Sequence, residues 1–107
     1  MNTDSAGKGP WIVSGADLVP TLEITTPRET VILSWNQFVY AEGSDVEVRI
    51  AFASHDVVVK GSGLDPLLHA IAANRVASIR VSSRAECFPS VAGRFISEIV
   101  VRKVEEA

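Results

Sequence analysis

Alternation of apolar and polar residues between Asp45 and Gly61 constrains the fold more than any other part of the chain. Successive side chains of an extended strand point to opposite faces, so every second residue shares a face. The apolar residues that share one face of the first half are Val46, Val48, Ile50 and Phe52. Residues 56–61 are typical of the return strand, and together the two halves predict a β-hairpin.

One pairing of this hairpin keeps its apolar and polar faces separate. It places Phe52 opposite Val57 and Ile50 opposite Val59, with residues 53–56 as the loop. A slip by one residue would bring charged side chains onto the apolar face, because the side-chain period of a strand is two. We therefore predict this pairing, with the apolar face covered by a helix.

The residues after the hairpin predict one short helix over about residues 65–74. Asp65 is of the type that accepts hydrogen bonds from the first free N–H groups of a helix, and Pro66 suits the first turn. Asn74 tolerates left-handed backbone geometry and is expected to end the helix. The apolar residues with helical spacing are Leu64, Leu67, Leu68, Ile71 and Ala72.

Runs of β-branched and aromatic residues predict further strands on both sides of this centre. These runs cover residues 11–13, 18–26, 30–35, 76–83 and 94–104. In the second run, Leu22 and Ile24 are expected to point inward. Residues 31–41 fit either one bent strand or a strand with a helical turn, and residues 94–104 fit a strand better than a helix.

The order of these elements predicts an α+β fold in a chain of 107 residues, the usual size of one domain. We expect a mostly antiparallel sheet of six or seven short strands, open or curled into a small barrel, with one short helix packed on it. The domain should span residues 11–104, with a flexible segment at 1–10 and frayed residues at 105–107.

Charge and cysteine content limit the classes of function. The formal net charge is −3, from 13 acidic and 10 basic residues, which gives no general attraction to nucleic acid or to anionic membranes. Cys87 is the single cysteine and has no partner for an internal disulfide. No apolar run approaches the roughly 18 residues that span a membrane. We therefore expect a cytoplasmic protein.

Two groups of residues resemble chemical motifs. Ser54, His55 and Asp56 are the residue types of a hydrolase triad, but three consecutive residues do not readily converge, and they suit a turn. His55, His69 and Cys87 are the soft metal ligands, and none is paired at the spacing of a metal site. The sequence therefore predicts no catalytic residue, no metal and no cofactor.

Two surfaces are candidates for binding. Arg75, Arg80 and Arg84 form a basic cluster that would suit single-stranded nucleic acid. Val58, Ala70 and Ala73 are small or apolar residues that we expect on the outside of the hairpin and the helix, where they would suit self-association. An exposed hairpin edge would also need a partner, a covering element or closure into a barrel.

These observations favour a non-catalytic interaction or assembly module that forms a homo-oligomer and binds protein partners. A small barrel that binds single-stranded nucleic acid is the first alternative. A small enzyme is the second, with a site built from residues distant in sequence, such as Glu42, His55 and Cys87.

Overall fold

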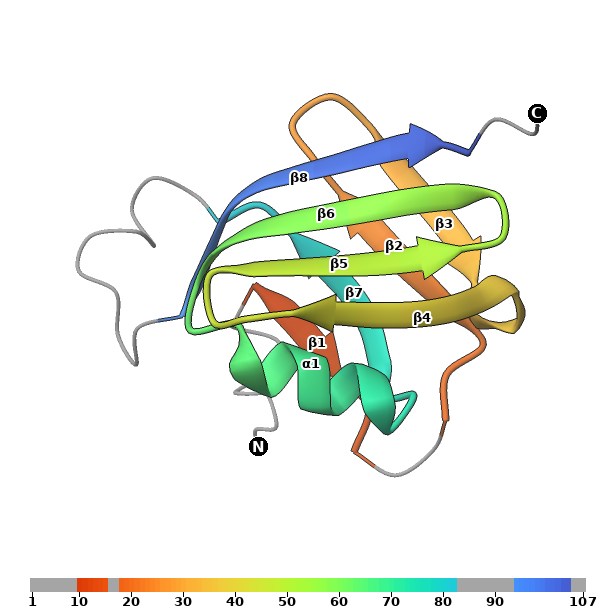
Figure 1. Ribbon diagram of the computed structural model, residues 1–107, viewed down its shortest axis with the longest axis horizontal. Coiled ribbons are helices and arrows are strands. Elements are labelled where there is room, and N and C mark those ends of the chain that lie inside the picture. Colours follow the sequence, from red (N-terminus) through yellow and green to blue (C-terminus); the bar gives the residue numbers. More distant parts are fainter. Residues whose placement is uncertain (1–9, 16–17, 83–93, 105–107) are drawn as a thin grey trace, which may run out of the picture.

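A computed structural model of the protein describes residues 10–15, 18–82 and 94–104 (Figure 1). The predicted flexible segment 1–10, apart from Pro10, and the predicted frayed residues 105–107 lie outside this part. The described elements are β1 (Trp11–Val13), β2 (Thr21–Thr25), β3 (Thr30–Ser34), a 3-10 turn (Trp35–Gln37), β4 (Phe38–Gly43), β5 (Glu47–Phe52), β6 (His55–Ser62), α1 (Asp65–Ala72), β7 (Val76–Arg80) and β8 (Phe95–Lys103).

The strands of the described residues form two four-stranded sheets. Sheet A has the order β1-β7-β2-β3, and sheet B has the order β4-β5-β6-β8. Strands β2 and β7 run parallel, and the other neighbours in both sheets run antiparallel. The predicted α+β class with mostly antiparallel pairing is therefore confirmed. The described residues form eight strands where six or seven were expected, and their two sheets are open where a closed barrel was one option.

The core lies between the two sheets, which stack face to face with their strands crossing obliquely (Figure 1). Sheet A contributes Leu22, Ile24 and Ile79, which are fully buried. Sheet B contributes the inward faces of β5, β6 and β8, namely Val48, Ile50, Phe52, Val57, Val59, Ile96 and Ile99. The inward positions predicted for Leu22 and Ile24 are confirmed.

The helix α1 lies beside one open end of this sandwich (Figure 1). It packs against β4 and β7, and it buries Leu64, Leu67 and Ile71 in the core. The predicted short helix packed on the sheet is confirmed, and it shares the cover of the apolar face of the β5–β6 hairpin with sheet A. A single short helix is too narrow to cover a four-stranded sheet.

The start of the helix differs from the sequence prediction. Leu64 is the N-cap residue and its side chain makes no capping bond, while Asp65 is already inside the helix. The carboxylate of Asp45, in the β4–β5 turn, accepts the N–H groups of Gly63 at 3.2 Å and Asp65 at 3.1 Å. The cap therefore comes from a residue distant in sequence. At the other end, Asn74 has a φ of 56°, as expected for a helix stop.

The hairpin pairing differs by two residues from the predicted one. Ile50 lies opposite Val57 and Val48 opposite Val59, with Ala53 and Ser54 alone between the strands. A shift by two preserves the faces, so the predicted inward side is right although the pairing is wrong. Val46 also lies outside β5 and is 59% exposed, where an inward position was expected.

The region of residues 31–41 is a strand, a helical turn and a second strand. The 3-10 turn Trp35–Gln37 carries the chain from β3 at the edge of sheet A to β4 at the edge of sheet B. Trp35 is buried there against Phe38 and Phe52, with ring centroids 5.5 and 5.4 Å away. Residues 94–104 contain the strand β8, which confirms that prediction.

Candidate functional site

The residues that resemble a hydrolase triad lie at the β5–β6 turn without forming a relay. Ser54 Oγ lies 2.7 Å from His55 Nδ1. The Asp56 carboxylate instead accepts a hydrogen bond from Arg49 at 2.8 Å on the outer face of sheet B. A triad needs the carboxylate on the histidine, so this geometry is that of a turn followed by a cross-strand ion pair.

The candidate metal ligands do not meet within the described residues. His69 is 78% exposed on α1, with Nδ1 3.6 Å from the Asp65 carboxylate. His55 lies at the β5–β6 turn, and Cys87 lies outside the described residues. The proposed enzyme site of Glu42, His55 and Cys87 therefore also stays a prediction. In the described ranges no three side chains of His, Cys, Asp or Glu gather as a metal site would require.

The arginines predicted for nucleic-acid binding occupy different settings. Arg75 follows α1, and its guanidinium donates to the C=O of Gly15 at 3.1 Å. Arg80 lies on β7 beside Thr25, next to the buried Ile79. Arg84 lies outside the described residues. The nucleic-acid hypothesis stays a prediction.

The residues predicted for self-association are also separated. Val58 is half-buried on the outer face of sheet B, between Arg49 and Val100 on the neighbouring strands. Ala70 packs against the core, and Ala73 is exposed at the end of α1. The edges of the hairpin are not free, because β4 and β8 pair with them.

Strand β8 forms one edge of sheet B. The N–H of Val104 donates to the C=O of Ser54 at 2.9 Å. Since backbone groups alternate in direction along an antiparallel strand, Val100 and Arg102 bond toward β6. Ile99, Val101 and Lys103 then direct their N–H and C=O groups away from β6. We call these three residues the free edge of β8; within the described residues no strand pairs with them.

The free edge has a defined beginning. The N–H of Ile96 donates to Ser82 Oγ at 2.9 Å, and the Ser82 N–H donates to the Ile96 C=O at 2.8 Å. At Ile96, therefore, Ser82 occupies the side of β8 that faces away from β6. This position lies just before the irregular pairing opposite Lys60 and Gly61. From Glu98 to Lys103 the strand is regular and nothing in the described chain pairs with its outer side.

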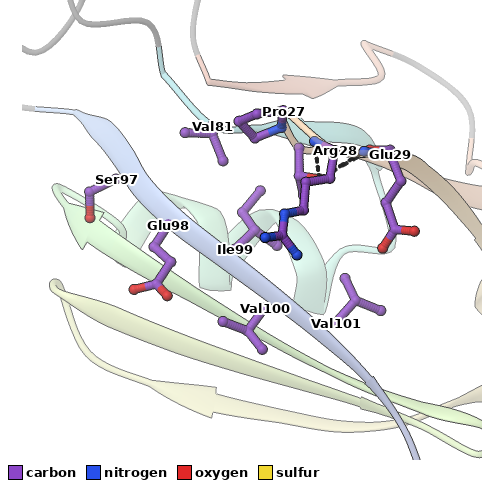
Figure 2. A pocket seen from close by; sticks show the side chains of 10 residues that line it. Pro27, Arg28, Glu29, Val81, Ser97, Glu98, Ile99, Val100 and Val101 are labelled. Carbon is purple, nitrogen blue, oxygen red and sulfur yellow. Dashed lines mark hydrogen bonds between the residues drawn. The ribbon is translucent and has the colours of Figure 1, made fainter.

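A pocket of about 470 Å³ adjoins the free edge (Figure 2). Its walls are Ser97–Val101 of β8, Val81 and the β2–β3 turn 26–29. Thr26 holds this turn, because its Oγ1 accepts the N–H groups of Arg28 and Glu29 at 3.2 Å. Figure 2 shows the Arg28 side chain reaching from the turn toward β8. The pocket is thus the open side of the sandwich.

The other strands at sheet edges are less suited to pairing. Strand β1 has three residues with a register irregularity, and β4 is irregular between Phe38 and Tyr40 and lies against α1. Short strands, bulges and covering elements are the usual means by which proteins protect edges. Strand β3 is regular, but it has five residues where β8 has nine.

The outer face of sheet B carries charges that alternate from strand to strand. One row runs Glu47, Lys60, Glu98 across β5, β6 and β8. Asp56 lies beside Arg102 in another row and also binds Arg49. The hydrogen bond and charge of Asp56 raise the pKa of Arg49. These rows end at β8 with Glu98 and Arg102 exposed.

The chain matches no protein-family model, and comparisons with characterised proteins and with solved structures found no match. None of the described helices has the length and apolar character needed to cross a membrane. Sequence reasoning missed the free edge of β8, although Glu98-Ile99-Val100-Val101-Arg102, with opposite charges flanking three apolar residues, was a visible signal.

Proposed function

We propose that this protein is a non-catalytic assembly module that self-associates by adding a strand to the free edge of β8. The observation that carries the proposal is the regular stretch of β8 from Glu98 to Lys103, whose outward N–H and C=O groups have no strand partner in the described chain. In β-strand addition, main-chain hydrogen bonds of this kind provide affinity, and pockets beside the strand provide specificity.

The surroundings of the free edge support this mode of binding. Ile99 is 8% exposed and Val101 is half-buried, so the edge sits on the rigid core and not on a loop. The adjoining pocket offers space for side chains of an added strand. A site already held in strand geometry loses little conformational entropy on binding.

Sedimentation velocity over a series from micromolar to millimolar protein tests the proposal. We expect the mean sedimentation coefficient to rise with concentration. Val101→Pro should suppress that rise, because it removes an outward N–H while leaving the β6–β8 hydrogen bonds in place. A wild-type protein that remains monomeric throughout the series would count decisively against self-association.

Ile32→Pro is the matched control. The Trp35 N–H donates to the Pro20 C=O at 2.9 Å, so by alternation the N–H of Ile32 points outward from β3, the edge of sheet A. This variant makes the same change on the other sheet and should associate like the wild type. Circular dichroism of both variants checks that the strands remain folded. If both variants lost self-association equally, the cause would be a disturbed fold and not a change at the edge of β8.

We extend the proposal to a cytoplasmic location. The single cysteine supports it, because proteins of oxidising compartments commonly carry disulfides. Fractionation of cells expressing the chain, followed by detection with an antibody, tests this point, and recovery with secreted proteins would contradict it.

A further inference from the structure

Resting on the proposed self-association, we propose that two copies pair their β8 strands antiparallel across a two-fold axis at Val100. The occupant of the free edge is then a second copy of this chain. The two B sheets become one continuous eight-stranded sheet, β4-β5-β6-β8 followed by the partner's β8-β6-β5-β4. Two-fold pairing of identical surfaces is the commonest arrangement of homo-oligomers.

Backbone geometry is consistent with this axis. Ile99 faces the partner's Val101, and both residues direct their N–H and C=O groups outward. Each such pair exchanges two hydrogen bonds, and the two-fold axis generates the pair twice. Val100 faces its own copy at a position without hydrogen bonds, where opposed side chains approach most closely. An apolar residue suits that central position.

Charge complementarity selects the register. With the axis at Val100, Glu98 lies opposite the partner's Arg102, and Arg102 lies opposite the partner's Glu98. The row Glu47, Lys60, Glu98 then continues into the partner's Arg102 and Asp56, so its charges alternate without interruption across the interface. Opposite charges directly across a strand pair stabilise it, and like charges destabilise it.

Neighbouring registers lose these contacts. An axis at Val101 places Glu98 opposite the partner's Val104 and brings the partner's Lys103 against Ile99 on the inner face. An axis at Ile99 places Arg102 opposite the partner's Ile96, whose N–H and C=O are already bonded to Ser82. Of these three registers, only the axis at Val100 pairs both charges and uses outward backbone groups that have no strand partner within the described residues.

The inner face agrees with the same arrangement. Ile99 and Val101 line the pocket between β8 and the β2–β3 turn. In the dimer, the partner's Ile99 and Val101 stand on the same side of the continuous sheet, at the mouth of that pocket. The open side of each sandwich thereby gains an apolar cover. A single pair of strands brings few residues of each copy into contact, so we expect a weak dimer with a dissociation constant on the order of micromolar.

Mixing two charge variants tests the register. Glu98→Arg alone places arginine opposite Arg102 twice in its dimer, and Arg102→Glu alone places glutamate opposite Glu98 twice. Each should dimerise about tenfold more weakly than the wild type. An equimolar mixture forms heterodimers in which both pairs carry opposite charges, so its association should return close to the wild-type level.

Matched controls separate the interface from the fold. Glu47→Arg also puts an arginine beside Lys60, and Arg49→Glu also puts a glutamate beside Asp56, but both lie on β5, away from β8. These controls should dimerise like the wild type. If wild type dimerises, Val101→Pro does not, and the mixture associates no better than its components, the register is wrong while the proposed function stands. A monomeric wild type would overturn both.

Discussion

The indole N–H of Trp35 donates a hydrogen bond to the backbone C=O of Val76 across 3.0 Å in the buried core. Trp35 begins the turn that carries the chain from sheet A to sheet B, and Val76 begins β7. The bond therefore ties the crossing between the layers to a central strand of sheet A. Trp35 and Val76 are separated by 41 residues, so the contact fixes tertiary and not local structure.

Trp35→Phe should lower the free energy of unfolding by about 1–3 kcal/mol, since a buried C=O then loses its donor while the aromatic packing is largely kept. Urea unfolding followed by circular dichroism measures the change. An unchanged slope of the free energy of unfolding against urea concentration would show that the same surface is exposed on unfolding. A variant as stable as the wild type would show that the C=O finds another donor.

Asp45→Ala should destabilise the protein by about 1–2 kcal/mol, because it removes the acceptor of two N–H groups at the start of α1. Asp65→Ala is the informative comparison. The sequence favours Asp65 as the cap, whereas in the structure it is the first helical residue, so this change should cost only a few tenths of a kcal/mol. Thermal unfolding of both variants decides between the two assignments, and the opposite ranking would refute the remote cap.

Gly61→Ala should destabilise the protein by about 1–3 kcal/mol. A Cβ at this position would collide with the backbone of Phe95 and Ile96, where β6 and β8 approach at the irregular pairing. Gly15→Ala is the control, because a Cβ there has no neighbour within 4 Å. Chemical denaturation should show a loss for Gly61→Ala and little change for Gly15→Ala.

Val100→Lys should weaken the proposed dimer strongly, since two lysines would face each other at the two-fold axis. Val58→Lys adds the same charge to the same outer face one strand away and should have a smaller effect. Sedimentation equilibrium gives both dissociation constants. Equal dimer dissociation constants for the two variants would show that the two-fold axis does not lie at Val100.

Periodicity predicted which side chains face inward better than it predicted which residues lie opposite. The faces of the β5–β6 hairpin are right for Ile50, Phe52, Val57 and Val59, and the pairing is shifted by two residues. Both pairings satisfy the alternation equally. Tertiary contacts favour the observed one: the Ala53 N–H donates to Gln37 C=O at 2.7 Å, and Phe52 packs on Trp35.

Long-range partners also account for the other departures. The cap of α1 comes from Asp45, and the apolar faces of the two sheets cover each other, so one helix is enough at the open end. No local pattern in the sequence reports which distant segment supplies such a partner. The candidate site was missed for the same reason. Whether β8 lies at an edge depends on the strand order of the sheet, which no local sequence pattern reports.

The strand order of sheet A has a consequence for biosynthesis. Strands β1 and β2 are not neighbours, because β7 inserts between them. On the ribosome, the emerging β1 and β2 must wait until the chain has been translated past Arg80 before either pairs with β7. The β4–β5–β6 meander needs no such delay. We therefore expect the nascent chain to form the β4–β5–β6 meander first, while β1 and the side of β2 that pairs with β7 stay accessible to chaperones until β7 has been translated.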